Sequence, residues 1–183
     1  MLFRSARKKP GEISYAATGR GRITHLTMEL MQNMTGIKLQ LVPYSGGPAQ
    51  AMNDITTGRV GLILDGYASL AGSLQGNAIK GLAQTSLERL KEFPDLPTVA
   101  ETLPGFQSGG WNVIIAPTGT PDAIVRKISA DMRRALDEPD VRAKLANLGA
   151  FVRHFTPEEL AAFTQSEQRV WRPILEQVAK EAQ

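Results

Sequence analysis

The chain has 183 residues, of which 42% are hydrophobic and 21% are charged, and its formal net charge is +3. This length suits one ordinary domain or two small lobes, and this composition excludes a disordered or fibrous chain. Scattered basic residues and an aromatic content of 6% argue against nucleic-acid binding, and the lack of cysteine excludes disulfides and thiolate chemistry.

The first ten residues contain basic side chains but lack the apolar core and the small-residue cleavage site of a secretory signal peptide. We expect residues 1–9 to form the last turns of a helix that Pro10-Gly11 ends. No apolar run in the sequence approaches the length that spans a bilayer.

Strand patterns and helix patterns alternate over residues 12–84, which predicts an α/β fold with a mostly parallel sheet. The expected strands are 12–17, 38–43, 60–65 and 79–84. The expected helices begin after Arg22, run from Pro48 to about Gly58, and cover 68–74. On the first helix, apolar residues three or four apart predict the buried face, which consists of Ile23, Leu26, Leu30 and Met34.

Prolines and glycines break up regular structure between residues 93 and 110, and we predict a domain boundary there. Beyond it we expect a strand at 111–116, two helices that open at Pro121 and Pro139, and a last helix that runs toward Lys180. Thr156 and Glu159 have the spacing of a capping box at the start of this last helix.

The turn after the first strand, Thr18-Gly19-Arg20-Gly21-Arg22, leads directly into a helix. A strand, a glycine-rich turn and a helix N-terminus together point several backbone N–H groups at one spot, which predicts an anion site. Arg20 and Arg22 lie where the helix dipole is positive, and a cation there costs roughly 0.3–1 kcal/mol. Either solvent screens the two arginines or they face an anionic ligand, and we favour the second interpretation.

Two further turns follow the second and third strands: Tyr44-Ser45-Gly46 and Asp65-Gly66. Ligands of open α/β sheets bind at the carboxyl ends of the strands, so these residues join the first turn as candidate ligand-binding residues. Backbone donors and arginine suit a small carboxylate or dicarboxylate. Asp65 has two open roles, as an acceptor for a ligand hydroxyl or amine, or as a simple turn-former.

The sequence offers no catalytic, metal-binding or cofactor-binding pattern, so we predict a protein that is not an enzyme and needs no cofactor. Its two histidines, His25 and His154, have no metal-ligand spacing, and a contact between His25 and Glu29 explains both residues. A dinucleotide fingerprint begins at Gly19 but has Thr24 in place of its third glycine, and the acidic residue expected about 20 positions on is missing.

Several short motifs occur along nearly the whole chain in a specific order. They are Tyr15-x-x-x-Gly19-x-Gly21-x-x-x-His25-Leu26, Val42-Pro43-Tyr44-x-Gly46, Leu96-Pro97-Thr98-Val99-Ala100-Glu101, Ala116-Pro117-x-Gly119-Thr120-Pro121 and Thr156-Pro157-Glu158-Glu159. Together they resemble the substrate-binding proteins of tripartite tricarboxylate transporters, also called the Bug or TctC family. The family usually has small residues where this chain has Arg20 and Arg22, which implies a more strongly anionic ligand.

The resemblance implies a periplasmic binding protein of type II-like fold, with two lobes that close on a small organic acid and deliver it to a membrane permease. Residues 11–107 would form the second lobe and 108–183 the C-terminal part of the first, with 1–10 as the remnant of a helix. We expect the first lobe to be incomplete, because the export signal and the N-terminal segment of the family are missing. Two alternatives stay open: a truncated remnant that binds nothing, and a nucleotide-dependent α/β enzyme.

Overall fold

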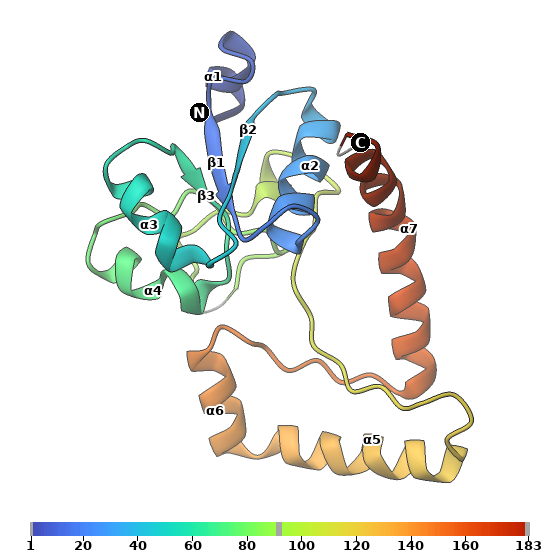
Figure 1. Ribbon diagram of the computed structural model, residues 1–183. Coiled ribbons are helices and arrows are strands. Elements are labelled where there is room, and N and C mark those ends of the chain that lie inside the picture. Colours follow the sequence, from blue (N-terminus) through green and yellow to red (C-terminus); the bar gives the residue numbers. More distant parts are fainter. Residues whose placement is uncertain (1, 91–92, 182–183) are drawn as a thin grey trace. The chain divides into compact units, whose positions relative to one another are not determined.

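The computed structural model describes residues 2–90 and 93–181 (Figure 1). The chain divides into two compact units, of which the first comprises Met1–Gly110 and Gln177–Gln183 and the second Trp111–Glu176. The strands of the described chain all lie in the first unit, and the regular structure of the second unit is helical. The assignment of residues 11–107 and 108–183 to the two lobes of a binding protein stays a prediction.

The first unit is built on a three-stranded parallel sheet with the strand order β2-β1-β3. Ala17 at the end of β1 is in register with Pro43 of β2, and Ala16 is in register with Ile63 of β3. The parallel α/β arrangement predicted from the alternating pattern is therefore confirmed. The strands are β1 (Ser14–Ala17), β2 (Gln40–Pro43) and β3 (Leu62–Ile63).

Helices pack on both faces of this sheet, because successive side chains of a strand point to opposite sides. Tyr15 and Ala17 of β1 belong to one core cluster with Met28 and Met31, whereas Ala16 belongs to a second cluster with Ala51. Figure 1 shows α2 (Ile23–Thr35) and α3 (Pro48–Thr56), which connect the strands, beside the sheet. α1 (Leu2–Lys8) precedes the first strand, and α4 (Tyr67–Gln75) follows the last.

The predicted apolar face of α2 is confirmed at Leu26, which is 6% exposed, and at Leu30, which packs against the core, but not at its two ends. Ile23 and Met34 are 38% and 39% exposed, whereas Thr24, His25 and Thr27 are buried. These polar side chains are buried because each has a hydrogen-bond partner, which removes most of the cost of taking it out of water. Thr27 donates its hydroxyl to the carbonyl oxygen of Ile23 at 2.7 Å, and the hydroxyl oxygen of Ser108 lies 2.5 Å from that of Thr27.

The strand predicted at 79–84 does not form. Only a single parallel bridge joins Gln84 to Thr98. The bridge cannot extend because Thr98 caps a 3₁₀ helix, η1 (Val99–Glu101), by accepting the backbone N–H of Glu101 on its side chain. The chain therefore turns away from the extended conformation immediately after its first paired residue.

In the second unit, the strand predicted at 111–116 is also absent, and the exposed fractions of Ile114 and Ile115 are 62% and 84%. A strand needs a neighbour to satisfy its backbone groups, and within residues 2–90 and 93–181 none pairs with this segment. The three predicted helices do form. They are α5 (Asp122–Asp137), α6 (Pro139–Asn147) and α7 (Pro157–Glu181).

The predicted capping box at the start of α7 is confirmed. The backbone N–H of Glu159 donates to Oγ1 of Thr156 at 3.1 Å, and the backbone N–H of Thr156 donates to Oε2 of Glu159 at 2.7 Å. The two bonds satisfy two backbone donors that the first turn of a helix leaves free.

Candidate functional site

Three turns of the first unit lie at one edge of the sheet. Residues 18–22 follow β1, 44–47 follow β2, and 64–66 follow β3. Because the three strands are parallel neighbours, their carboxyl ends meet at the same edge. The structure thus brings all the candidate ligand-binding residues of the sequence to one side of the sheet, although their role in binding stays a prediction.

Each of these turns ends at the start of a helix whose first residues lack a side-chain cap. The N-cap residues of α2, α3 and α4 are Arg22, Gly47 and Gly66, and none makes a side-chain capping bond. The first N–H groups of a helix have no partner within the helix, and the helix dipole is positive there. Three positive helix ends with free donors therefore share one edge of the sheet.

The first turn has a backbone shape that requires glycine. Gly19 has φ of +133° and Gly21 has φ of +76°, in the region that side-chain-bearing residues rarely adopt. Two side chains from the beginning of α2 hold the turn. The backbone N–H of Thr18 donates to Oγ1 of Thr24 at 3.2 Å, and that of Gly21 donates to Nδ1 of His25 at 3.0 Å.

A buried network behind the turn fixes His25. The side chain of His25 is 2% exposed, and its Nε2 lies 3.4 Å from Oε1 of Glu29, which confirms the predicted contact. The same carboxylate accepts hydrogen bonds from the Tyr15 hydroxyl at 3.1 Å and from the Gln32 amide at 2.8 Å. Leu39, just before β2, in turn donates its backbone N–H to Gln32.

The electrostatics of this network favour an ionised Glu29. Burial alone would raise the pKa of Glu29, but hydrogen bonds from His25 and Tyr15 outweigh burial and lower it. Burial and then the charge of Glu29 raise the pKa of Tyr15 above its usual range, so its hydroxyl stays a donor. The turn is therefore backed by a carboxylate with several hydrogen-bond donors.

Arg20 and Arg22 are exposed, and neither guanidinium group forms a hydrogen bond or an ion pair with another residue of the described chain. Arg22 is the N-cap residue of α2. The positive charge of Arg20 acts to lower the pKa of Tyr15, but burial and Glu29 outweigh it. Both guanidinium groups are thus available to an anion at the positive end of α2.

The second turn is held by α3. Tyr44 donates its hydroxyl to Oδ2 of Asp54 at 2.6 Å, and Asp54 also pairs with Arg59. Gly46 donates its backbone N–H to the side-chain oxygen of Gln50 at 3.2 Å, while Ser45 is exposed. The Tyr44 hydroxyl is thus bonded within the turn region, whereas the Ser45 hydroxyl has no hydrogen-bond partner among the described residues.

In the third turn, Asp65 has one engaged and one unengaged oxygen. Its Oδ1 accepts the backbone N–H of Gly66 at 2.7 Å, as expected of a turn-former. Its Oδ2 is buried and has no hydrogen-bond partner among the described residues. The structure therefore supports Asp65 as a turn-former, and its unpartnered oxygen leaves the role of a ligand acceptor open.

Comparison with known proteins places the chain in a family. The family model described as TctC, "Tripartite tricarboxylate transporter family receptor", matches residues 2–179. The chain belongs to this family. A curated relative from Pseudomonas sp. (strain P51), "UPF0065 protein in tcbD-tcbE intergenic region", is 34% identical over 176 residues, which are 95% of this chain and 52% of the relative.

Two solved structures from R. palustris share the fold of this TctC chain. "R. palustris Rpa4515 with adipate" is 30% identical with a TM-score of 0.81, and the match covers 97% of this chain and 60% of that one. "MatC (Rpa3494) from Rhodopseudomonas palustris with bound malate" is also 30% identical, with a TM-score of 0.75 and coverage of 95% and 60%. The chain thus spans about half to three fifths of the length of the relatives described here.

The type II-like periplasmic binding fold with an incomplete lobe, predicted from the resemblance, is confirmed by these likenesses. The structure at Thr24 argues against the alternative of a dinucleotide-binding fold. Its hydroxyl bonds Thr18 in the TctC turn, at the position where a dinucleotide fold needs the third glycine.

Sequence reasoning missed the roles of three residues at the site. Thr24 and His25 hold the first turn, and Gly47 begins α3. The spacing of His25 from Gly21 is the four-residue step that joins the start of a helix to its first turn, so this contact could have been found. Gly47 has no side chain to indicate its role, which only the structure shows.

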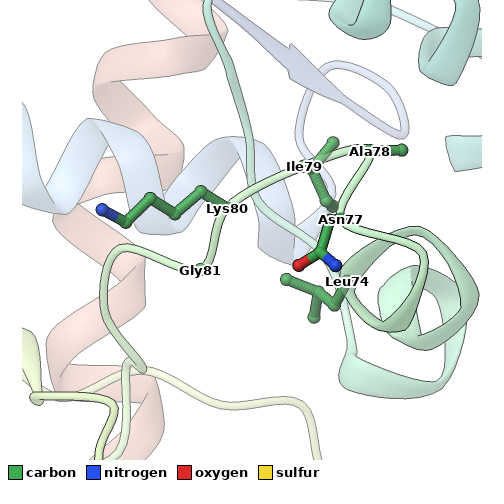
Figure 2. Close-up of a pocket in the computed structure, with 6 residues that line it drawn as sticks. All are labelled: Leu74, Asn77, Ala78, Ile79, Lys80 and Gly81. Atoms are coloured by element: carbon green, nitrogen blue, oxygen red, sulfur yellow. The ribbon is translucent and has the colours of Figure 1, made fainter.

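A shallow depression of about 540 Å³ lies elsewhere in the first unit. It is at the carboxyl end of α4, whereas the candidate turns lie at the amino ends of the helices. Figure 2 shows the Lys80 side chain extending away from Asn77 and Leu74, so no polar groups converge there. We therefore retain the turns as the candidate site. The lining residues are Leu74, Asn77, Ala78, Ile79, Lys80 and Gly81.

Among residues 2–90 and 93–181, no group of three His, Cys, Asp or Glu side chains is placed to hold a metal ion. In the same ranges, no helix has both the length and the apolar character needed to cross a membrane.

Proposed function

We propose that this TctC chain is an extracytoplasmic solute-binding protein, or a truncated form of one, that holds a small organic di- or tricarboxylate at the edge of its sheet. The observation that carries the proposal is the convergence of three uncapped helix N-termini behind Arg22, Gly47 and Gly66. Free N–H groups and the positive dipole ends both favour a bound carboxylate.

The first turn supplies the strongest contacts in this proposal. Arg20 and Arg22 offer charge-assisted hydrogen bonds, which are shorter and stronger than those between neutral groups. The backbone N–H groups at the start of α2 add donors of fixed direction. Ser45 and the free oxygen of Asp65 would contact the rest of the solute, with Asp65 accepting from a hydroxyl, an amine or a protonated carboxyl group.

The solved relatives support a carboxylate ligand, since one is described with adipate and another with malate. The family description supports delivery of the solute to the membrane permease of a tripartite tricarboxylate-type transporter, and hence a periplasmic location. We propose binding without chemical conversion. The histidine nearest the turns, His25, is buried and committed to Gly21 and Glu29, so it is poorly placed as a general base.

Thermal denaturation of the 183-residue chain in the presence of ligand tests this proposal. A ligand that binds only the folded chain stabilises it by about 2.7 kcal/mol at a concentration of 100 times its Kd, so even weak binding raises the melting temperature. We expect adipate and malate to raise it, and 1,6-hexanediol at equal concentration and sodium chloride at equal ionic strength to have no such effect. Equal melting temperatures in all four solutions would favour the remnant that binds nothing.

A further inference from the structure

One contact of the first turn depends on the protonation state of its partner. Gly21 donates its backbone N–H to Nδ1 of His25 at 3.0 Å. A ring nitrogen that accepts a hydrogen bond must carry a lone pair rather than a proton. The ring proton of His25 is therefore on Nε2, which faces Oε1 of Glu29 at 3.4 Å.

The groups around the His25 ring determine which of its two contacts a second ring proton would disrupt. Glu29 is the ionised carboxylate on the same helix, and the Tyr15 hydroxyl of β1 donates to it. Two further charges act on the pKa of Tyr15: Arg20 in the turn lowers it, and Glu181 near the end of α7 raises it. A protonated ring keeps Glu29 as the partner of Nε2, whereas its new N–H at Nδ1 points at the N–H of Gly21.

We propose that His25 is a positioning residue that holds the carboxylate-binding turn through its uncharged Nδ1, and that protonation of His25 releases Gly21 and weakens ligand binding. The inference rests on the proposed function for its second clause only. The histidine side chain is suited to this role because a neutral ring offers one nitrogen as an acceptor, whereas a protonated ring has two donors and no acceptor. Loss of this bond would free the backbone of Gly21, whose φ of +76° sets the direction of the turn.

The positioning role is tested first on the ligand-free chain by NMR. Spectra at about pH 8 and at about pH 5.5 report the protonation of the His25 ring nitrogens directly, and we expect the Gly21 amide shift and its hydrogen-exchange protection to change when Nδ1 of His25 gains a proton. A ring that gains no proton at Nδ1 over this range overturns the release step. His154, which contacts Asp137 in the second unit, provides the control through His154→Gln, which should leave the Gly21 titration unchanged. A Gly21 amide that stays protected while His25 becomes protonated overturns the proposal, as does an Nδ1 proton at the higher pH.

Two variants of His25 separate the effect of its hydrogen-bond acceptor from the effect of its protonation. His25→Asn places an oxygen near the position of Nδ1 but cannot be protonated, so the Gly21 amide should stay protected at both pH values. His25→Leu removes the acceptor, so protection should be lost at both. If His25→Leu fails to fold, the wild-type titration and His25→Asn still decide the question. Loss of protection in His25→Asn at acidic pH overturns the role of the imidazole.

The ligand step is tested with adipate on the same proteins. Between the two pH values, we expect wild-type affinity to fall about tenfold more than that of His25→Asn, because one hydrogen bond to the turn is lost. The variant also corrects for protonation of adipate itself. An equal fall in both proteins overturns the release step. If adipate binds neither protein at any pH, the proposed function and the release step both fail, while the ligand-free titration still decides whether His25 positions the turn.

Discussion

The backbone N–H of Tyr44 donates to the carbonyl oxygen of Ala17 at 2.8 Å, one residue beyond the paired end of β2. This bond extends the pairing of β1 and β2 to the first residue of the second turn. The first and second turns therefore begin at the same level of the sheet, and their relative position is set by the backbone. Exposed side chains of the first turn, such as those of Arg20 and Arg22, can therefore be replaced while this backbone bond is kept.

Replacement of Arg22 by alanine should weaken carboxylate binding without weakening the fold. A charge-assisted hydrogen bond contributes about 1.5–3 kcal/mol, so the Kd should rise about tenfold to a hundredfold. The free energy of unfolding should stay nearly constant or rise slightly, because an unfavourable charge leaves the positive end of α2. Calorimetric titration with dicarboxylates and urea denaturation measure the two quantities.

Lys80→Ala is a matched control, because it removes an exposed basic side chain of the same unit at the carboxyl end of α4. Its affinity should equal that of the wild type. Equal affinity in the wild type and in the Arg20/Arg22 double alanine variant would mean that both arginines are solvated bystanders.

Gly21→Ala should destabilise the chain, and Gly72→Ala should stabilise it. A Cβ at either position would meet no atom within 4 Å, so the difference comes from the backbone alone. Gly21 has φ of +76°, where a side-chain-bearing residue costs roughly 1–2 kcal/mol. Gly72 lies within α4, where alanine gains about 0.5–1 kcal/mol over glycine. Urea denaturation of both variants measures the changes, and a stable Gly21→Ala variant would contradict the strained turn.

The three strands and the order of the helices in the first unit could be predicted from the sequence, because periodicity reports local structure directly. The buried face of α2 could be predicted at Leu26 and Leu30. The burial of its polar residues could not, since it depends on hydrogen-bond partners that a hydrophobic pattern does not report. Thr27 bonds the carbonyl oxygen of Ile23 within its own helix and also the hydroxyl of Ser108, 81 residues further along the chain. Hydrophobicity alone therefore selected Ile23 and Met34 for a face that the structure leaves partly exposed.

The two strands that failed to form have a related cause. Residues 79–84 and 111–116 have strand-like composition, but a strand is stable only beside another strand. Without a neighbouring strand, the first segment keeps only a single bridge at Gln84, and the second leaves Ile115 84% exposed. The candidate turns were found from the sequence because they follow the three strands that do pair.

The ion pair between Arg89 and Glu101 should make stability depend on acidic pH. Two hydrogen bonds from Arg89, and then the backbone N–H of Thr98, lower the pKa of Glu101 from 4.5 to about 2. Because the folded pKa is the lower one, the contribution is complete above the unfolded pKa and is lost as the pH falls from 4.5 through about 2. Urea denaturation across this range should show a smaller loss in Glu101→Gln than in the wild type, and parallel curves would refute the prediction.

Tyr15→Phe should destabilise the first unit by about 1.5–3 kcal/mol, because Glu29 loses a buried donor while the ring still fills the core. Tyr44→Phe is the matched comparison. Its hydroxyl bonds Asp54, a more exposed carboxylate that Arg59 also pairs, so its loss should cost below about 1 kcal/mol. Chemical denaturation of the two variants side by side tests the order, and a larger loss in Tyr44→Phe would contradict it.

The most direct measurement of the central claim is an NMR titration of the 183-residue chain with adipate, followed at every assigned backbone amide. Three uncapped helix starts should hold the carboxylate, so the account predicts that the largest shift changes fall on residues 18–24, 45–49 and 65–68. The largest changes at residues 77–81 around the depression in Figure 2, or no change at any amide at high adipate concentration, would contradict it.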